Sequence, residues 1–352
     1  MFIEENYKLI YTFVIMKKIK NYQKNSFIKK LFIKLCRVFN FEIIDQASFS
    51  SPSLNKDLGE TLSIQGKKSI TIPLGQINIT RKVSSVKIIL RTCTSELIMD
   101  QNKRRLFDCE KNEYTLRTLK SLINSIKQAK LILNKINFEI IVTDTNSYQS
   151  DINKIQEILK HSNLNHKFIS VDLKIFKEKI TPGYSNAKFS NMANFYNSLI
   201  IAKDEPADII YFVEDDYIHA KNSVSEMILS YEKFSTMFNN ELVLLPSDYP
   251  YLYTKDDYTK IYIGEKSHWR LVSESLVTFM TSKSVIDENY NNLKKMGIEW
   301  TDPWEKPLHN VYNSNPCLSP IPSLAVHCAN INSVFGTSPF IDLKELWEKN
   351  KV

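Results

Sequence analysis

Glycine is scarce in this sequence, with seven residues in 352. None of the seven stands in the G-x-G-x-x-G or G-x-x-x-x-G-K-[ST] pattern that wraps a backbone around phosphate groups. Dinucleotide-binding and P-loop folds therefore lose their main support.

Cysteine is also sparse and shows no pairing pattern. The five cysteines are odd in number and widely spaced, and no C-x-x-C pair occurs among them. This usage predicts reduced thiols in a cytoplasm and argues against a disulfide framework or a zinc site.

Long apolar runs are missing too. No stretch reaches the roughly 20 apolar residues that span a bilayer, and residues 9–16 are short and interrupted by Tyr11 and Thr12. A cleavable signal peptide is not supported, because the charged block follows the apolar stretch and no small-residue cleavage site is evident. Translation from Met16, just before the basic segment, is an alternative to Met1 that the sequence leaves open.

The composition is that of a folded protein, with 43% hydrophobic and 24% charged residues. The length allows one catalytic domain of about 250 residues with an extension. Pattern and composition divide the chain into a basic amphipathic arm (1–44), an irregular linker rich in Pro and Gly (45–82) and an α/β domain (83–345).

The net charge of +7 is concentrated in the arm. Eight basic residues and no acid lie between Lys17 and Arg37, so the rest of the chain is near neutral and a nucleic-acid partner is not expected. Residues 26–39 have apolar side chains at helical spacing opposite lysines and arginine. Two interpretations stay open: residues 17–39 bind an anionic membrane surface, or the helix packs on the catalytic domain.

Strands and helices alternate beyond residue 83, which predicts a parallel sheet with right-handed crossovers. The tail from 297 to 339 is rich in Pro, Trp and Asn and is expected to form loops over the site. Strands are predicted at 86–90, 138–142, 166–171, 209–213, 241–245 and 275–281, and helices at 114–133, 151–161, 191–203 and 223–238.

Three consecutive acids, Glu214, Asp215 and Asp216, follow the apolar strand 209–213. Neighbouring carboxylates repel one another, so a fold tolerates them in open solvent or around a cation. Ligands of α/β proteins gather at the carboxyl ends of such strands. Strand alternation places Glu214 and Asp216 on one side, where they can share a divalent ion. An acidic turn that merely closes a core strand is the alternative.

Three segments in this order carry a family resemblance: residues 88–93 with 114–122, residues 140–147, and Asn197 and Ala202 with 211–216. Together they resemble a glycosyltransferase of the GT-A fold, closest to the broad family 2 type, over residues 86–217. The resemblance implies a Rossmann-like, mostly parallel sheet flanked by helices. Glu214 departs from the pattern, because it stands where the family's DxD motif begins with Asp.

The resemblance implies an inverting hexosyl or related transfer (EC 2.4 class) from a UDP- or GDP-linked sugar to a glycan or lipid-linked acceptor. The diphosphate leaving group then needs a cation, and Mg²⁺ or Mn²⁺ is expected at Glu214 and Asp216, with His327 completing the site. A buried core histidine is the alternative for His327. The residues assigned to the donor are Arg91, Thr92, Asp144, Asn197 and Asp215. Asp144 as a helix N-cap or turn residue and Arg91 as a surface ion pair remain alternatives.

An inverting transfer needs a general base, and the family places an acid late in the domain. Asp302 and Glu305 are the candidates, with Asp302 slightly favoured by position. For the acceptor, rings and polar groups that suit sugars occur at Asp248, Tyr249, His268, Trp269 and Arg270. An equal alternative is that these side chains only fill the edge of the hydrophobic core.

The favoured function is synthesis of a surface polysaccharide or lipid-linked glycan by a cytoplasmic enzyme at the inner face of a membrane. A sugar nucleotidyltransferase is a rival, although it should open with a glycine-rich loop. A metal-dependent phosphohydrolase is another, although only His219 is close to the acids as a further ligand. A non-catalytic carbohydrate-binding module is the third.

Overall fold

The computed structural model describes residues 27–39, 77–95, 105–254, 259–328 and 334–352, and it divides the chain into two compact units, 1–76 and 77–352. Most of the predicted arm and linker lies outside the described residues. The second unit begins six residues before the predicted start of the α/β domain at residue 83.

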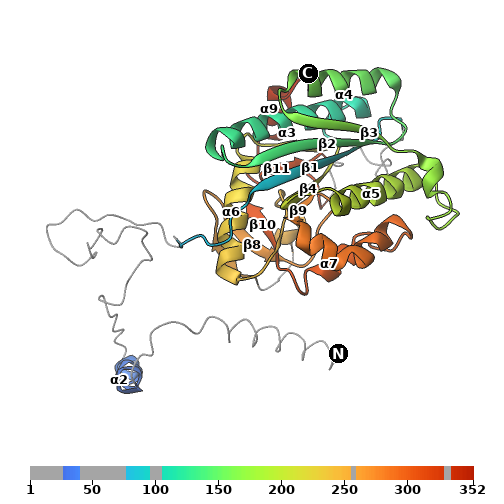
Figure 1. Ribbon diagram of the computed structural model, residues 1–352. Coiled ribbons are helices and arrows are strands. Elements are labelled where there is room, and N and C mark those ends of the chain that lie inside the picture. The colour runs from blue at the N-terminus through green and yellow to red at the C-terminus, as the bar shows by residue number, and fades with distance from the viewer. Residues whose placement is uncertain (1–26, 40–76, 96–104, 255–258, 329–333) are drawn as a thin grey trace. The chain divides into compact units, whose positions relative to one another are not determined.

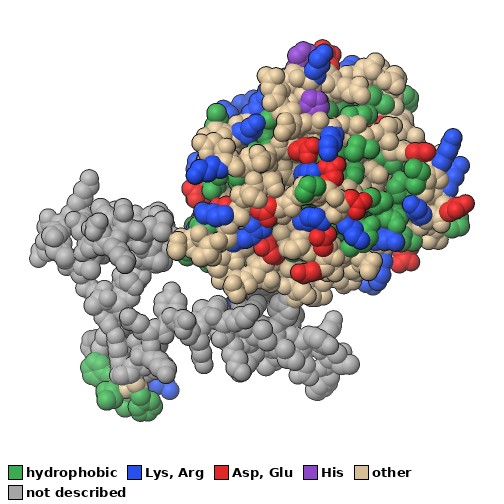
Figure 2. All heavy atoms as spheres, in the orientation of Figure 1, with side chains coloured by type: hydrophobic (Ala, Val, Ile, Leu, Met, Phe, Trp, Pro, Cys, Tyr) green, Lys and Arg blue, Asp and Glu red, His purple; other side chains and the backbone are tan. Residues whose placement is uncertain are grey.

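The described part of the first unit is helix α2 (Phe27–Val38), where the sequence predicted it. Large apolar side chains of this segment are exposed, and Figure 2 shows several of them together on the helix surface. They are Phe27, Ile28, Leu31, Phe32, Leu35, Val38 and Phe39. Within the described ranges, no helix combines the length and the apolar character that a bilayer crossing requires.

The second unit is built on a nine-stranded sheet in the order β3-β2-β1-β4-β9-β6-β10-β8-β7 (Figure 1). β3, β2, β1 and β4 are parallel neighbours, whereas β9 and β8 run against the other strands. The expected α/β architecture with a mostly parallel sheet is therefore confirmed. The strands are β1 (Ser85–Thr92), β2 (Asn137–Asp144), β3 (Asn165–Ser170), β4 (Ile209–Glu214), β6 (Val243–Leu244), β7 (Ile261–Ile263), β8 (His268–Val272), β9 (Phe279–Ser282) and β10 (Cys317–Ile321).

Helices cover both faces of the sheet because each central strand is apolar on both sides (Figure 1). On one face, α3 (Lys111–Ile132), α4 (Gln149–His161) and α6 (Ser223–Phe238) pack on side chains such as Ile88 and Tyr211. On the other, α5 (Asn186–Asp204), α7 (Lys283–Leu293) and α8 (Lys306–Val311) pack on Ile89 and Phe212. A last helix, α9 (Leu343–Lys349), packs through Trp347 against Tyr114 of α3.

The tail differs from its prediction as loops. Residues 297–339 include α8, strand β10 within the main sheet, and β11 (Ala325–His327), which pairs antiparallel with β5 (Tyr217–His219). These strands are short and β10 contains Pro320, so they lack the alternation that marks a strand in sequence. The β5–β11 pair brings His327 opposite Tyr217, directly after the three acids.

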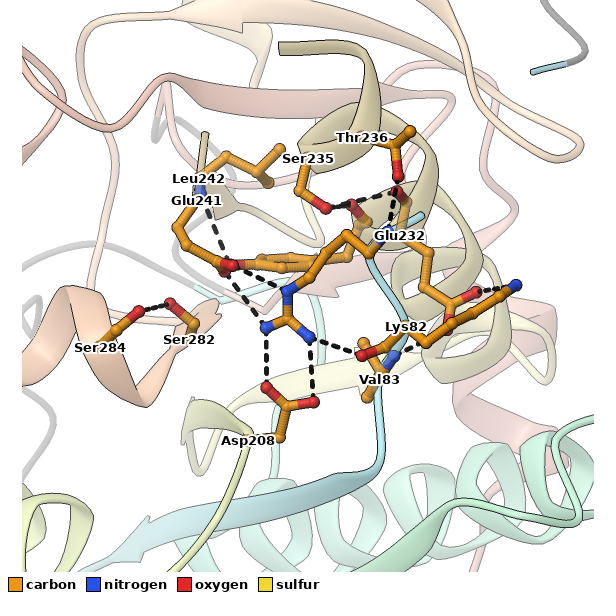
Figure 3. Close-up of polar contacts among 12 residues, drawn as sticks. Lys82, Val83, Asp208, Glu232, Ser235, Thr236, Glu241, Leu242, Ser282 and Ser284 are labelled. Carbon is orange, nitrogen blue, oxygen red and sulfur yellow. Dashed lines mark hydrogen bonds and ion pairs between the residues drawn. The ribbon is translucent and has the colours of Figure 1, made fainter. Parts of the chain in front are cut away.

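The start of the second unit is fixed by Arg81. Its guanidinium pairs with Asp208, just before β4, at 2.7 Å and with Glu241, just before β6, at 2.7 Å. Figure 3 shows these two acids in one cluster, with Glu232 accepting the Val83 backbone N–H nearby. This cluster ties the entering chain to the amino edge of the sheet.

The surface of the second unit mixes charges of both signs on the face that Figure 2 shows. No single basic field stands out on that face, as expected for a near-neutral body. All five cysteines lie in described residues, and none of them forms a disulfide.

Candidate functional site

A cavity of about 430 Å³ opens at the carboxyl edge of the sheet, where β1 and β4 end. It collects most of the predicted donor, metal and base residues, although they come from four separate parts of the sequence. The predicted residues that line it are Arg91, Thr92, Glu214, Asp215, Asp216, Asp302, Glu305 and His327.

Arg91 and Glu214 form an ion pair across neighbouring strands, with Nη2 of Arg91 3.0 Å from Oε1 of Glu214. Nη1 of Arg91 donates to Asn191 Oδ1 at 2.9 Å, and its guanidinium lies over the Phe195 ring. Burial raises the pKa of the Glu214 carboxyl, and the positive charge of Arg91 opposes that rise. The two charges compensate one another in a largely buried position.

Asp215 ties three segments together. Its Oδ2 accepts the Cys93 backbone N–H at 3.3 Å and the Thr115 hydroxyl at 2.9 Å, and Lys111 Nζ is 4.0 Å away. This carboxylate therefore joins the end of β4 to the end of β1 and the start of α3. The sequence assigned Asp215 to the donor, and in the structure this residue also lines the cavity.

Asp216 is held by two basic groups at the same oxygen. Its Oδ2 lies 3.1 Å from Arg105 Nη2 and 3.3 Å from His327 Nε2. Burial alone would raise the pKa of Asp216, but His327 and Arg105 hold it well below its usual range. Burial opposes the charged form of His327, yet Asp216 raises the pKa of this imidazole above its ordinary value.

The orientation of His327 is set by two neighbours. Its Nδ1 is 3.0 Å from the Phe335 carbonyl oxygen, so Nδ1 carries the proton that is donated there. Its ring stacks on Tyr217 with centroids 4.8 Å apart. Nε2 therefore faces Asp216, and in the neutral imidazole this nitrogen has the lone pair that a metal ion binds.

These residues fit a divalent ion only in part. Asp216 Oδ2 and His327 Nε2 are close enough to share an ion, whereas Glu214 is paired with Arg91. Across the described residues, no three His, Cys, Asp or Glu side chains converge as a complete metal site. Mg²⁺ is commonly held by one or two carboxylates together with substrate phosphates. The donor set fits an ion whose coordination a bound diphosphate would complete.

Asp144 does not line the cavity. Its carboxylate accepts the Thr92 hydroxyl at 2.7 Å and the Ser147 backbone N–H at 3.2 Å, and it is fully buried. Burial raises the pKa of this carboxyl, whereas those hydrogen bonds act to lower it. Asp144 is the last residue of β2, and its contacts with Ser147 are those of a residue that begins a turn, which was an alternative interpretation of Asp144.

Asn197 is also outside the cavity, and two asparagines earlier on the same helix line it instead. Asn194 Nδ2 donates to the carbonyls of Thr92 at 3.1 Å and Thr143 at 2.9 Å, joining the ends of β1 and β2. Asn191 accepts from Arg91. A crossover helix starts at the carboxyl edge of the sheet and runs away from it, so its first turns face the site.

Glu305 and Asp302 both line the cavity. Burial raises the pKa of Glu305 to about 7, with the negative charge of Glu214 adding to that rise. Asp302 is exposed. Trp300 and Trp304 also face the cavity and stack on each other, with centroids 5.1 Å apart. The segment 300–305 is thus part of the cavity wall.

The five predicted acceptor residues lie elsewhere. Trp269 is fully buried against Phe234, and Asp248 is buried in an ion pair with Arg270. The Tyr249 hydroxyl meets the Tyr217 hydroxyl at 2.8 Å in the core. His268 is exposed on β8. For four of these five residues the contacts are those of a core edge.

Arg105 and Lys111 are cavity residues that the sequence did not single out. Neither belongs to a recognisable motif, and Arg105 follows the end of β1 only after a long connection. The one available signal was electrostatic, because three adjacent acids require nearby cations. Each of the three acids has such a cation: Arg91 for Glu214, Lys111 for Asp215 and Arg105 for Asp216.

No protein-family model matches the sequence, and no curated protein matches it. Among solved structures, an active-site mutant of LgtC is 10% identical with a TM-score of 0.35, covering 66% of this chain and 72% of LgtC. The bifunctional glycosyltransferase WbbM in its apo form is 10% identical with a TM-score of 0.35, covering 74% of this chain and 39% of WbbM. Galactosyltransferase LgtC with donor and acceptor sugar analogues is 12% identical with a TM-score of 0.31, covering 64% of this chain and 66% of that one. The TM-scores and the sequence identities of these three matches are too low to support a conclusion about the activity of this chain.

Proposed function

We propose that this chain is a glycosyltransferase of the GT-A type that takes a sugar from a nucleoside-diphosphate donor in the cavity at the carboxyl edge of the sheet. The observation that carries the proposal is the composition of this one cavity. It joins the three acids at the end of β4, the buried Arg91 and the carboxyl group of Glu305. A binding site, a place for the leaving group and a base thus lie within reach of one bound substrate.

The leaving diphosphate needs positive charge, and the described cavity wall has more acids than bases. Three Lys or Arg side chains face five Asp or Glu side chains there. We therefore retain the dependence on Mg²⁺ or Mn²⁺, with Asp216 and His327 as the residues that would hold the ion. When bound, such an ion neutralises charge that develops on the leaving phosphate oxygens.

Glu305 is the proposed general base of an inverting transfer. A base works best when its pKa is close to the working pH, and the burial of Glu305 brings it to about 7. Asp302 is exposed, so water surrounds its carboxylate and competes with an acceptor hydroxyl for it. Glu305, rather than Asp302, is therefore assigned to the acceptor hydroxyl.

The acceptor is proposed to be a glycan or a lipid-linked glycan that stacks on Trp300, which is partly exposed at the cavity. Helix α2 presents apolar side chains to its surroundings and lies in the basic arm, which suits an anionic membrane surface. We therefore place the enzyme in the cytoplasm, peripheral at the inner membrane face, in polysaccharide or lipid-linked glycan synthesis.

The proposal is tested by incubating the protein with UDP- and GDP-linked sugars and an acceptor panel in Mn²⁺, and by measuring free nucleoside diphosphate. Acceptor-dependent release that is lost in Glu305→Gln supports it, and the anomeric configuration of the product tests inversion. Formation of nucleoside triphosphate and sugar 1-phosphate after addition of pyrophosphate would favour the nucleotidyltransferase instead. Release of nucleoside monophosphate and sugar phosphate without an acceptor would favour the phosphohydrolase. Binding of a nucleotide-sugar without transfer to any acceptor would favour the carbohydrate-binding module.

A further inference from the structure

Arg105 forms an ion pair with the same oxygen of Asp216 that faces His327. Its Nη2 is 3.1 Å from Asp216 Oδ2, and its guanidinium lies over the Tyr114 ring at 4.7 Å from the centroid. This oxygen is the one that would bind a metal ion together with His327 Nε2. Arg105 thus supplies positive charge at the place where the proposed function requires a divalent ion.

The cavity also has buried donors that lack acceptors. Counting only the described residues, Nη1 of Arg105 and Nε of Arg91 are buried and make no hydrogen bond. Arg91 is 4% exposed, and both arginines line the cavity. A buried donor without an acceptor loses its hydration without compensation, and oxygens of an anionic ligand restore the missing hydrogen bonds. Guanidinium groups bind phosphate oxygens particularly well, through two parallel hydrogen bonds.

We propose that Arg105 is an internal counter-cation: it neutralises Asp216 in the nucleotide-free protein and turns, together with Arg91, to the diphosphate when the nucleotide binds. This inference rests on the proposed function. It assigns the diphosphate to Arg91, which the sequence had assigned to the donor, and to Arg105, which no sequence motif marks. Arg105 then pairs with Asp216 before the nucleotide binds and with the diphosphate afterwards.

Two effects of opposite sign follow for Arg105→Gln. In the nucleotide-free protein, Arg105 and a divalent ion compete for one carboxylate oxygen, since two cations so close together repel each other. Removing Arg105 should therefore strengthen the binding of Mn²⁺ alone. With the nucleotide present, the same change removes a charge-assisted hydrogen bond to phosphate and should weaken nucleotide binding.

The experiment measures Mn²⁺ binding to the full-length protein without nucleotide, from the electron paramagnetic resonance signal of free Mn²⁺. It then measures binding of UDP or GDP, whichever binds wild type, by calorimetry in saturating Mn²⁺. For Arg105→Gln we expect Mn²⁺ affinity to rise about fivefold or more and nucleotide affinity to fall about tenfold, as for other hydrogen bonds to charged groups. Lys111→Gln is the matched control: it removes one positive charge from the same cavity without touching Asp216, and it should change Mn²⁺ affinity by less than about twofold.

Unchanged or weaker Mn²⁺ binding by Arg105→Gln would overturn the proposal, as would an equal rise in Lys111→Gln. Should Arg105→Gln be insoluble, Arg105→Lys decides: it keeps the charge but loses the two-pronged donor, so nucleotide affinity should fall while Mn²⁺ affinity stays near wild type. Absence of any nucleotide binding to wild type would refute the proposed function, whereas the Mn²⁺ comparison would still test Arg105 at Asp216.

Discussion

Arg91 of β1 and Glu214 of β4 are direct register partners on neighbouring parallel strands, and their side chains pair at 3.0 Å where both strands end. The pair forms because parallel strands bring their carboxyl ends to the same edge of the sheet. The two residues are 123 positions apart in the sequence, and both line the cavity.

Breaking this pair should destabilise the fold. In Arg91→Met the Glu214 carboxylate loses its buried partner, and we expect the free energy of unfolding to fall by about 2 kcal/mol at pH 7. Urea unfolding of this variant, of Glu214→Gln and of the double variant gives the free energy of interaction between the two side chains. Additive losses in the double variant would show that the two side chains do not stabilise one another.

Glu305 predicts a pH dependence of turnover. A base acts in its ionised form, and the pKa of Glu305 is raised to about 7 by burial. We therefore expect kcat/KM to rise with pH through about 7 and then to level off. Glu305→Gln should lose most of the activity and this rise, whereas Asp302→Asn should keep the rise. A pH profile that Asp302→Asn flattens would transfer the role to Asp302.

The same shift predicts a change of stability with pH. Because the folded pKa of Glu305 lies above the unfolded value of 4.5, the folded state binds more protons between these two values. The contribution of Glu305 to stability is thus present below pH 4.5 and is lost as pH rises through about 7. Compared with wild type, Glu305→Gln should show a smaller loss of unfolding midpoint between about pH 5 and 8.

Removal of Trp269 should affect stability, whereas removal of Trp300 should affect acceptor binding. Trp269 is fully buried, so Trp269→Ala should lower the free energy of unfolding by about 3–5 kcal/mol. Trp300 is partly exposed at the cavity, so Trp300→Ala should change stability by less than about 1 kcal/mol and raise KM for the acceptor. A stable Trp269→Ala with impaired acceptor binding would restore the role that the sequence assigned to Trp269.

Helix α2 should bind anionic vesicles. Ile28, Leu31 and Leu35 share its exposed apolar face, so their joint replacement by Ser should release the protein from phosphatidylserine vesicles in sedimentation. Deletion of residues 1–40 should do the same and leave nucleotide affinity intact. Equal partitioning of wild type and both variants would refute the membrane role of the arm.

The regular half of the fold was predictable from sequence. Helix α6 has the predicted bounds 223–238, because an apolar stripe at helical spacing is a strong signal over four turns. The strands β5, β7 and β11 were missed because each is three residues long, too short to show alternation. Strands β8 and β10 were missed with them, so of the strands beyond β4 in the sheet only β6 and β9 had been predicted, at 241–245 and 275–281.

The site was predictable where a residue lies at the carboxyl end of a strand or directly after it. Arg91 and Thr92 at the end of β1 and the three acids at the end of β4 belong to this group, and all of them line the cavity. Arg105 was not predictable, since its position depends on how the chain returns to Asp216. The asparagines needed a further step: Asn191, Asn194 and Asn197 follow one another along one helix, and only the direction of the helix tells which of them reach the site.

Calorimetric titration of UDP and GDP with and without Mn²⁺, on wild type and Asp216→Ala, tests the central claim most directly. We predict that one nucleotide binds wild type in the presence of Mn²⁺ and that this binding is lost in Asp216→Ala. Failure of both nucleotides to bind wild type under either condition would contradict a nucleoside-diphosphate site in the cavity.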